Sequence, residues 1–452
     1  MANRETDYLI VGCSAAGVSA ADHIRAADPR GRVLVVGDEP HAAYGRPLIS
    51  HLVKGEIAED LIGFKDARFF ESRAIETLLG PSFKAVELDA GAHRAVLENG
   101  DSVAYQSCLI ATGSAPVLPP IGGLDGRSNV FQFRTLDQAK RVRRAAVEAA
   151  AKAHARGRMS RALVVGAGLV GLKAAEALCC LVDDVVVVGR APRILRAVLD
   201  ERGSSMLQEA LNRHGISCLT GVSVDKLVGG GPSVASAVLT NGDAIDCDLV
   251  VLAAGMKPNA ELAVRAGAAQ ARGLACGADL RTSLPDVYAA GDVAQVTEGL
   301  DEMRQPLALW PNAVRQGKVA GKFMAGTPDA QPLTGDFAVN AVDFFGTPLL
   351  TSGVVNPPDD GGFDVLTRAE GSEYAKFVAK DDRLVGYILL NRPTNAGIYT
   401  ALIERRVPLS SLKGDLFDRV PLNLDFPADR RWERLHIGYP RELDERGWRR
   451  GL

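Results

Sequence analysis

Several features are missing from this sequence of 452 residues, and each absence excludes a class of protein. No run of about 20 apolar residues is present, so the sequence predicts no membrane-spanning helix. The net charge of −3 gives no reason to expect binding to nucleic acid or to a membrane surface. The first residues, MANRETDYLIVG, carry mixed charge and enter a strand at once, which is unlike a secretory signal.

The cysteines lack any pattern that would give them a structural or metal-binding role. There are seven, an odd number, and none forms a C-x-x-C motif. This argues against a disulfide framework and against zinc or an iron–sulfur cluster held within the chain, so we expect no metal site and a cytoplasmic protein. Cys179 and Cys180 are adjacent within a helical pattern, and we predict that they lie in the core.

The sequence does contain two glycine-rich turns, each of which follows an apolar strand. The first, YLIVGCSAAG, covers residues 8–17, and the second, RALVVGAGLVG, covers residues 161–171. In the first turn Gly12, Ser14 and Gly17 occupy the G-x-G-x-x-G positions, with serine in place of the second glycine. Such a turn brings a pyrophosphate to the N-terminus of the following helix. Two such turns predict that the chain binds two dinucleotides.

Each turn leads into a helix and a second strand. We expect helices over 18–27 and 172–179 and strands over 32–36 and 184–188. The first of these strands ends at Asp38, 21 residues after the last glycine of its turn. An acid at this distance is expected to accept hydrogen bonds from adenosine ribose hydroxyls.

The corresponding strand of the second unit ends differently, at Gly189-Arg190. No acid is present there to repel a 2′-phosphate, and Arg190 and Arg193 could accommodate one. This favours NADPH, or the use of both coenzymes. The alternative is that both arginines are simply solvated.

Further motifs carry a resemblance to a known family. Tyr44-Gly45-Arg46-Pro47 opens a turn before a helix, residues 107–116 read SCLIATGSAP, and residues 282–294 read TSLPDVYAAGDVA. With the two glycine turns, and in this order, they resemble the FAD-dependent pyridine nucleotide oxidoreductases. The closer likeness is to rubredoxin and ferredoxin reductases, the flavin domains of NADH-dependent nitrite reductases, and NADH oxidases. It covers residues 1 to about 425.

The resemblance implies an α/β fold with two Rossmann-like nucleotide-binding domains and an α+β C-terminal interface domain. An FAD-binding domain at 1–116 and 255–330 would be interrupted by an NAD(P)-binding domain at 117–254. The interface domain at 331–425 usually pairs two protomers. The extension at 426–452 contains Trp and Arg, and would be a docking tail or an arm over its own interface domain.

The resemblance also implies the cofactor contacts, with FAD at the first turn and NAD(P)H at the second. The residues expected to bind FAD are Gly12, Ser14, Ala15, Ala16, Gly17, Asp38, Glu39, Arg46, Ala111, Thr112, Gly113, Gly291, Asp292, Trp310 and Pro311. Those expected to bind NAD(P)H are Gly166, Gly168, Leu169, Val170, Gly171, Arg190, Arg193 and Gly255.

Two positions depart from the family pattern. The family usually carries Lys where this sequence has His51, and Glu where it has Lys173, so the charges look swapped. We predict that both residues are catalytic, and that Lys173 stabilises an anionic reduced flavin. The alternative is a surface lysine on a helix face.

The thiol-dependent members of the family carry a redox cysteine near Tyr44, or two cysteines five residues apart, and this sequence has neither. We therefore expect an FAD-dependent NAD(P)H oxidoreductase that exchanges electrons with an external partner. The partner would be an iron–sulfur or rubredoxin-type protein, or the partner subunits of a larger enzyme, and the chain would form a homodimer or join a hetero-complex. One alternative is an NAD(P)H oxidase that reduces dioxygen at the flavin. Another is a redox-sensing flavin-binding protein of the apoptosis-inducing-factor kind, because fold alone does not fix activity.

Overall fold

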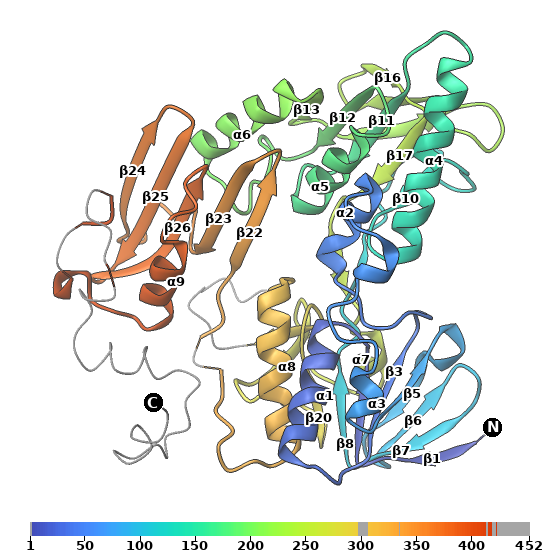
Figure 1. The fold of residues 1–452 in the computed structure, drawn as a ribbon, viewed down its shortest axis with the longest axis vertical. Helices are drawn as coiled ribbons and strands as arrows, with labels where there is room; N and C mark the ends of the chain where they lie inside the picture. The colour runs from blue at the N-terminus through green and yellow to red at the C-terminus, as the bar shows by residue number, and fades with distance from the viewer. Residues whose placement is uncertain (1, 297–305, 334, 413–414, 418–421, 423–452) are drawn as a thin grey trace, which may run out of the picture.

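The computed structural model describes residues 2–296, 306–333, 335–412, 415–417 and 422. Within these residues the strands form three five-stranded sheets and several smaller ones (Figure 1). Two of the large sheets are parallel and the third is antiparallel. Of the helices that the structure describes, none combines the length and the apolar character that crossing a membrane would require.

The first parallel sheet contains the first glycine turn. Its strand order is β20 (Val287–Ala289), β8 (Ser107–Ile110), β2 (Tyr8–Val11), β3 (Val33–Gly37) and β4 (Ile75–Leu79). Helices α1 (Ala15–Ala27) and α8 (Trp310–Met324) lie side by side on this sheet (Figure 1). Their backbones can come this close because Gly317 has no side chain. A Cβ at this position would lie 2.2 Å from the carbonyl oxygen of Ala16. The chain thus returns to its own beginning after some 290 residues.

The second parallel sheet contains the second glycine turn. Its strand order is β10 (Val130–Gln132), β17 (Leu249–Leu252), β11 (Arg161–Val165), β12 (Asp184–Gly189) and β13 (Ile216–Thr220). The helices beside it are α4 (Leu136–His154), α5 (Leu169–Leu178) and α6 (Glu201–Arg213). Every residue of β17 is buried, as expected for a parallel strand covered on both faces.

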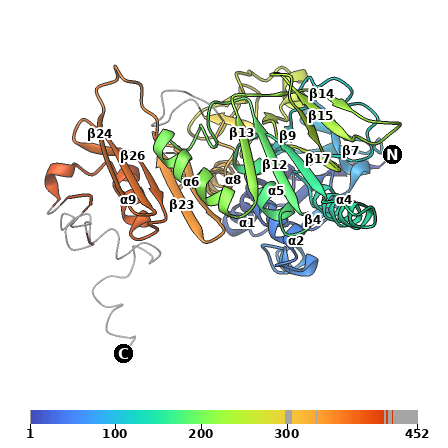
Figure 2. The ribbon, with the colours of Figure 1, turned by 90° about the horizontal axis from the view of Figure 1, so that it is seen from above.

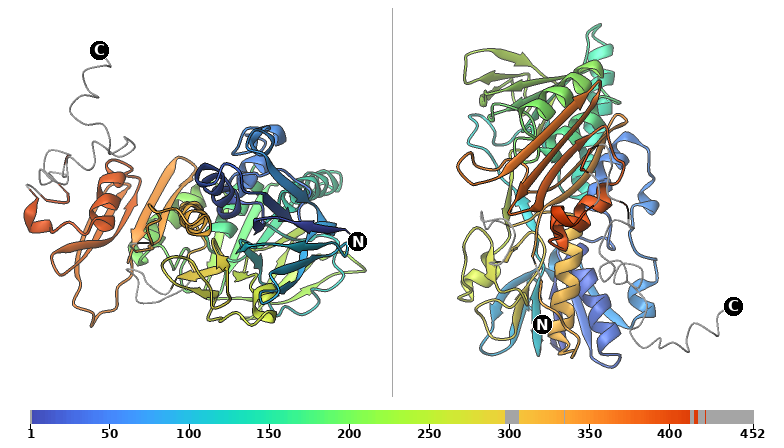
Figure 3. Two further views of the ribbon diagram at one scale, coloured as in Figure 1. Left: turned by 90° about the horizontal axis from the view of Figure 1, so that it is seen from below. Right: turned by 90° about the vertical axis from the view of Figure 1, so that its left-hand side faces the viewer.

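The third sheet is antiparallel and lies beside α6 (Figures 2 and 3). Its strand order is β22 (Val339–Phe344), β23 (Thr347–Gly353), β26 (Arg383–Leu390), β25 (Glu373–Lys380) and β24 (Asp364–Glu370). Helix α9 (Ala396–Glu404) packs on it through Tyr399, whose ring contacts Phe377 and Tyr387. These three sheets confirm the predicted fold class.

Short strands β9 (Ser114–Pro116) and β18 (Met256–Pro258) pair where the chain leaves the first sheet and where it returns to it. The other strands are β1 (Asn3–Glu5), β5 (Ala85–Asp89), β6 (Arg94–Leu97), β7 (Ser102–Ala104), β14 (Val224–Val228), β15 (Ser236–Leu239), β16 (Ala244–Asp246), β19 (Leu274–Cys276) and β21 (Ala294–Val296). The other helices are η1 (Arg46–Leu48), α2 (Ile49–Lys54), η2 (Glu59–Leu61), α3 (Phe69–Ser72), η3 (Pro81–Phe83), α7 (Glu261–Arg265) and η4 (Leu409–Ser411).

Several predicted boundaries need correction. Helices α1 and α5 each begin three residues earlier than predicted, at Ala15 and Leu169, because the last glycine of each turn is already helical. Helix α5 therefore ends at Leu178, before the two adjacent cysteines. Cys179 is only half-buried and Cys180 is exposed, so the prediction that both lie in the core was wrong.

Candidate dinucleotide and redox site

The first glycine turn is shaped by backbone contacts that only glycine allows. Gly12 has a φ of 123°, and a Cβ there would lie 2.1 Å from the carbonyl oxygen of Ala111 at the end of β8. A Cβ at Gly17 would lie 1.9 Å from the carbonyl oxygen of Gly12. Ser14 is the N-cap of α1, but its side chain caps nothing, and no acid lies in the first helical turn. The structure thus gives the first N–H groups of α1 no side-chain cap, as expected for a helix start that binds an anion.

The second turn repeats this geometry. Gly166 has a φ of 125°, and a Cβ there would lie 2.1 Å from the carbonyl oxygen of Ala253. Helix α5 likewise starts without a side-chain cap or an acid in its first turn. A Cβ at Gly168, in contrast, would meet nothing within 4 Å, so this glycine is not required by the protein's own packing. The space beside it fits a close approach of pyrophosphate to the backbone.

Arg46 reaches the first turn from the segment after β3. Its Nε donates to Ser14 Oγ at 3.4 Å and its Nη1 donates to the hydroxyl of Tyr44 at 3.0 Å. Its Nη2 is paired with the carboxylate of Glu39. Of the two acids predicted to bind FAD at this strand end, Glu39 is thus engaged with Arg46, whereas Asp38, the one predicted to bind ribose, is exposed.

The Gly291-Asp292 motif lies at the same edge of the first sheet. Asp292 Oδ2 accepts hydrogen bonds from Ser114 Oγ at 2.6 Å and from Arg134 Nη2 at 3.0 Å. Burial, together with the positive charge of Arg46, lowers the pKa of Arg134. Sequence reasoning missed Arg134, although it follows strand β10 directly, as functional residues of parallel sheets often do.

The predicted Ala111-Thr112-Gly113 motif joins the two crossover segments. Thr112 Oγ1 donates to the carbonyl oxygen of Asn259 at 2.7 Å, and Asn259 Nδ2 donates to that of Thr112 at 2.9 Å. Gly255, which has a φ of 129°, accepts from the N–H of Val117 at 2.9 Å. These bonds fix the point at which the two nucleotide-binding units join.

Helix α8 begins at the predicted Trp310-Pro311. The ring of Trp310 meets Phe64 edge-to-face at 4.8 Å, and Pro311 is exposed. One turn further, Gln316 Oε1 accepts from the N–H of Gly291 at 2.8 Å, which ties the helix to the Gly-Asp motif. Within the described part of the chain, the Oδ1 atom of the fully buried Asn312 has no hydrogen-bond partner.

The two residues predicted to be catalytic lie on neighbouring helices but contact different groups. His51 on α2 is half-exposed and pairs through Nδ1 with Glu56 at 2.6 Å. Lys173 on α5 pairs with the carboxylate of Glu176, a residue only 2% exposed. Lys54 Nζ donates to the same carboxylate at 2.8 Å. Because Lys173 pairs with a buried carboxylate and is itself largely covered, the alternative of a solvated surface lysine does not fit.

The predicted swap of charges therefore needs correction. A Lys–Glu pair does join α2 and α5, but it is formed by Lys54 and Glu176, three residues after His51 and Lys173 respectively. Burial alone would raise the pKa of Glu176, yet hydrogen bonds from Lys173 and Lys54 outweigh it and hold this pKa below its ordinary value. The i,i+3 spacing of Lys173 and Glu176 is the sequence signal that could have pointed to this cluster.

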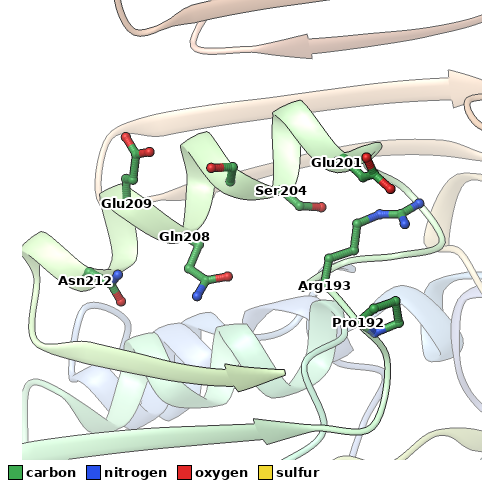
Figure 4. A pocket seen from close by; sticks show the side chains of 8 residues that line it. Pro192, Arg193, Glu201, Ser204, Gln208, Glu209 and Asn212 are labelled. Atoms are coloured by element: carbon green, nitrogen blue, oxygen red, sulfur yellow. The ribbon is translucent and has the colours of Figure 1, made fainter. Parts of the chain in front are cut away.

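The end of β12 presents the two arginines expected near a coenzyme. Arg190 is exposed and makes no hydrogen bond or ion pair within the described residues. Arg193 is half-buried and donates from Nε to the carbonyl oxygen of Leu199 at 3.3 Å. It lines a groove of about 430 Å³ under α6 and points toward Glu201 (Figure 4). The groove is also lined by Pro192, Ser204, Ser205, Gln208, Glu209 and Asn212.

The structure brings the predicted residues together at the carboxyl ends of two parallel sheets, which is where α/β folds bind ligands. The residues at the first sheet are Gly12, Ser14, Ala15, Ala16, Gly17, Asp38, Glu39, Ala111, Gly113, Gly291 and Asp292. Those at the second are Gly166, Gly168, Leu169, Val170, Gly171, Arg190 and Arg193.

The thiols stand apart from this chemistry. None of the seven cysteines forms a disulfide. Cys13, inside the first turn, is the thiol nearest to the predicted cofactor sites, and burial raises its pKa to about 12. It is therefore protonated at neutral pH and a poor nucleophile.

Comparison with known proteins confirms the expected family. A family model described as pyridine nucleotide-disulphide oxidoreductase matches residues 6–317. The chain belongs to this family. The epsilon subunit of NADH-dependent phenylglyoxylate dehydrogenase from Aromatoleum evansii is 32% identical over 413 residues, 90% of this chain and 94% of that subunit.

Two further relatives support this assignment. An NADH oxidase from Methanocaldococcus jannaschii is 31% identical over 323 residues, which are 70% of this chain and 70% of the oxidase. The crystal structure of the ferredoxin reductase for the CYP199A2 system from Rhodopseudomonas palustris matches with a TM-score of 0.80 and 26% identity. The match covers 91% of this chain and 98% of the reductase.

Proposed function

We propose that this protein is an FAD-dependent NAD(P)H oxidoreductase that passes electrons between a nicotinamide nucleotide and an external redox partner. The observation that carries the proposal is the repeated turn: two glycine-shaped strand ends, at Gly12 and Gly166, each face an uncapped helix N-terminus. FAD takes the first turn and NAD(P)H the second. Bound FAD supplies hydride acceptance and single-electron exchange, which no side chain can provide.

The residues of the chain bind and orient the two cofactors and provide the charges around them. The N-terminus of α1 and Arg46 hold the FAD pyrophosphate, and Asp292, fixed by Arg134, holds ribityl hydroxyls. The N-terminus of α5 holds the pyrophosphate of the coenzyme beside Gly168. Lys173 adds positive charge close to where electrons arrive.

The domain division follows from the same assignment. We propose that residues 1–116 and 255–330 form the FAD-binding domain and residues 117–254 the NAD(P)-binding domain. Its support is the β9–β18 pair, which lies where the chain crosses between the two parallel sheets. Residues 331–425 form the interface domain. The extension at 426–452, predicted to be a docking tail or an arm, lies outside the described residues.

The partner is an iron–sulfur or rubredoxin-type electron carrier, or the other subunits of a larger redox enzyme. The relative from Aromatoleum evansii is named as the subunit of a dehydrogenase, and the structural relative from Rhodopseudomonas palustris is a ferredoxin reductase. These names support a hetero-complex and a free carrier respectively. The chain also forms a homodimer through its third sheet, unless it joins a hetero-complex.

A second candidate is reduction of dioxygen, because the relative from Methanocaldococcus jannaschii is named an NADH oxidase. The two activities are separated by anaerobic and aerobic turnover. Anaerobic NADH or NADPH should bleach the flavin of the purified protein, and a ferredoxin or rubredoxin should then reoxidise it faster than air does. Rapid turnover with air and no carrier would favour the oxidase. Failure of both coenzymes to bleach the flavin would contradict the proposed function.

A further inference from the structure

The hairpin between β22 and β23 ends in a turn whose sequence does not suit its backbone. Phe344 pairs with Thr347, so the loop consists of Phe345 and Gly346 alone. Both have positive φ values, 53° and 77°. Two-residue turns with two positive φ values favour Asn-Gly or Asp-Gly, because few other side chains tolerate the left-handed region. A phenylalanine in the first position is strained.

Another hairpin of the same sheet follows the usual rule. Lys380 pairs with Arg383 around the loop Asp381-Asp382, whose φ values are 49° and 58°. The sheet therefore accommodates this type of turn with ordinary turn residues. Backbone strain that is kept at one particular position is a signal of function at that position.

The ring of Phe345 lies against a helix of the second nucleotide-binding unit. It stacks on His214 at the end of α6, with ring centroids 4.2 Å apart and an interplanar angle of 5°. The ammonium of Lys54, on α2, lies 6.0 Å from the centre of the same ring. One side chain from the third sheet thus reaches α6, beside the second sheet, and α2, which lies in the chain between β3 and β4 of the first sheet.

The backbone around Phe345 takes part in the charge cluster of Lys54, Glu176 and Lys173. The N–H of Phe345 donates to Glu176 Oε1 at 3.3 Å. The carbonyl oxygen of Asp343 accepts from Lys173 Nζ at 3.0 Å. Helices α2 and α5 supply the three charged side chains, and the hairpin tip closes the cluster from the third side.

We propose that Phe345 is a positioning residue that holds the Lys54–Glu176–Lys173 cluster in the arrangement needed for electron entry from the nicotinamide nucleotide. This statement rests on the proposed function and deepens it. The ring anchors the turn on His214, and the anchored turn fixes the carboxylate that in turn fixes both ammonium groups. Charges stabilise a reaction only when they are held in advance where charge develops, so a loosened cluster slows the reaction.

The test uses a substitution that suits the turn better than the natural residue. Phe345→Asn creates the favoured Asn-Gly turn but removes the ring, so the fold and the thermal midpoint should be retained or improved. Anaerobic stopped-flow reduction by NADH or NADPH should slow by roughly tenfold, since sub-ångström misplacement of reacting groups has effects of this size. The midpoint potential of the flavin should also shift. Phe345→Tyr keeps the stacked ring and should restore both values.

The controls separate positioning from a general effect on the sheet. Asp381→Asn, at the other hairpin turn, should leave the rate and the potential unchanged. In protein without added coenzyme, the ring protons of His214 should lose their ring-current shift in Phe345→Asn but keep it in Phe345→Tyr. This signal is assigned with His214→Gln.

The outcomes are distinct. A wild-type flavin that neither coenzyme reduces would overturn the proposed function itself. A wild-type flavin that is reduced, together with an unchanged rate and potential in Phe345→Asn, would overturn the role of Phe345 alone. Loss of activity in both Phe345→Asn and Phe345→Tyr would also overturn it, because the effect would not depend on the ring.

Discussion

Arg134 donates a hydrogen bond from Nη2 to Oδ2 of Asp292 at 3.0 Å, although 158 residues separate the two in sequence. Arg134 follows the first strand of the second sheet, and Asp292 follows the last strand of the first sheet. The contact therefore joins the two nucleotide-binding units at the edge where their strands end. It also fixes the carboxylate that we assign to the flavin.

The first prediction concerns this pair. Arg134→Ala should weaken FAD binding by roughly 30-fold, because the Asp292 carboxylate loses a charge-assisted hydrogen bond worth about 2 kcal/mol and keeps only the bond from Ser114 Oγ. The ratio of flavin to protein after gel filtration, and the Kd from FAD titration of apoprotein, measure the effect. Arg127→Ala serves as a control, since the half-exposed Arg127 donates, within the described structure, to the backbone carbonyl groups of Gly123 and Gly231. Equal FAD affinity in wild type and Arg134→Ala would refute the assignment.

The second prediction distinguishes two glycines of the second turn. Gly168→Ala should fold and bind FAD normally, because the added Cβ meets nothing within 4 Å. It should raise the KM for NADH and NADPH about tenfold or more, since the methyl group occupies space that we assign to pyrophosphate. Gly166→Ala should instead fail to give folded protein, because its Cβ would lie 2.1 Å from the carbonyl oxygen of Ala253. An unchanged KM in Gly168→Ala would place the coenzyme elsewhere.

The third prediction concerns the choice of coenzyme. Arg190→Ala should lower kcat/KM for NADPH by about tenfold and leave kcat/KM for NADH unchanged. A tenfold loss corresponds to the free energy of one charge-assisted hydrogen bond to the 2′-phosphate. Arg213→Ala, at the exposed end of α6, is the matched control and should affect neither coenzyme. A wild-type preference for NADH above about tenfold would contradict the assignment of a 2′-phosphate to Arg190.

The fourth prediction is a dependence of stability on pH. The pKa of Glu176 is lower in the folded protein than its ordinary 4.5, because the bonds from Lys173 and Lys54 outweigh the effect of burial. Its ion pairs therefore contribute fully above about pH 4.5, and the contribution is lost as the pH falls below that value. Glu176→Gln should cost roughly 3 kcal/mol at pH 7, because two ammonium groups lose their buried partner.

Urea unfolding from pH 7 to pH 3.5 measures this effect. The difference between wild type and Glu176→Gln should narrow below about pH 4.5. Glu261→Gln is the control, since the exposed Lys257–Glu261 pair should contribute less than about 1 kcal/mol. A difference that stayed constant across this range would mean that Glu176 does not titrate on unfolding as expected.

The fifth prediction concerns the thiols. Iodoacetamide at neutral pH should modify the exposed Cys180 first and leave Cys13 intact, because burial raises the pKa of Cys13 to about 12. Mass spectrometry identifies the modified residue. The alkylated protein should keep its NAD(P)H-dependent electron transfer, measured with ferricyanide. Loss of this activity in parallel with labelling of Cys180 would show that a thiol takes part.

Much of the site could be predicted from the sequence because its parts are local. The two turns, the Gly291-Asp292 motif and the start of α8 are contiguous segments whose backbone form dictates their residues. The starts of α1 and α5 were predicted three residues too late for one shared reason. The last glycine of each turn packs inside the first helical turn, and is not a break before it.

Helix α4 is hard to place from the sequence for a different reason. Helix α4 starts at Leu136, after a capping box formed by Thr135 and Gln138, and one of its faces is buried. The buried residues are Leu136, Ala139, Val142, Ala146, Ala149 and Ala153. Alanine at helical spacing carries little hydrophobic signal, so the charged residues between these positions dominated the pattern.

The sequence by itself determined the two dinucleotide turns, because each is one contiguous segment in which glycines at a fixed spacing follow an apolar strand. It also determined the absence of a paired redox thiol motif. Only the tertiary structure decided which charges meet. The Lys54–Glu176 pair and the turn at Phe345 combine segments from all three sheets, and their side chains act together because burial removes the water that would otherwise separate them.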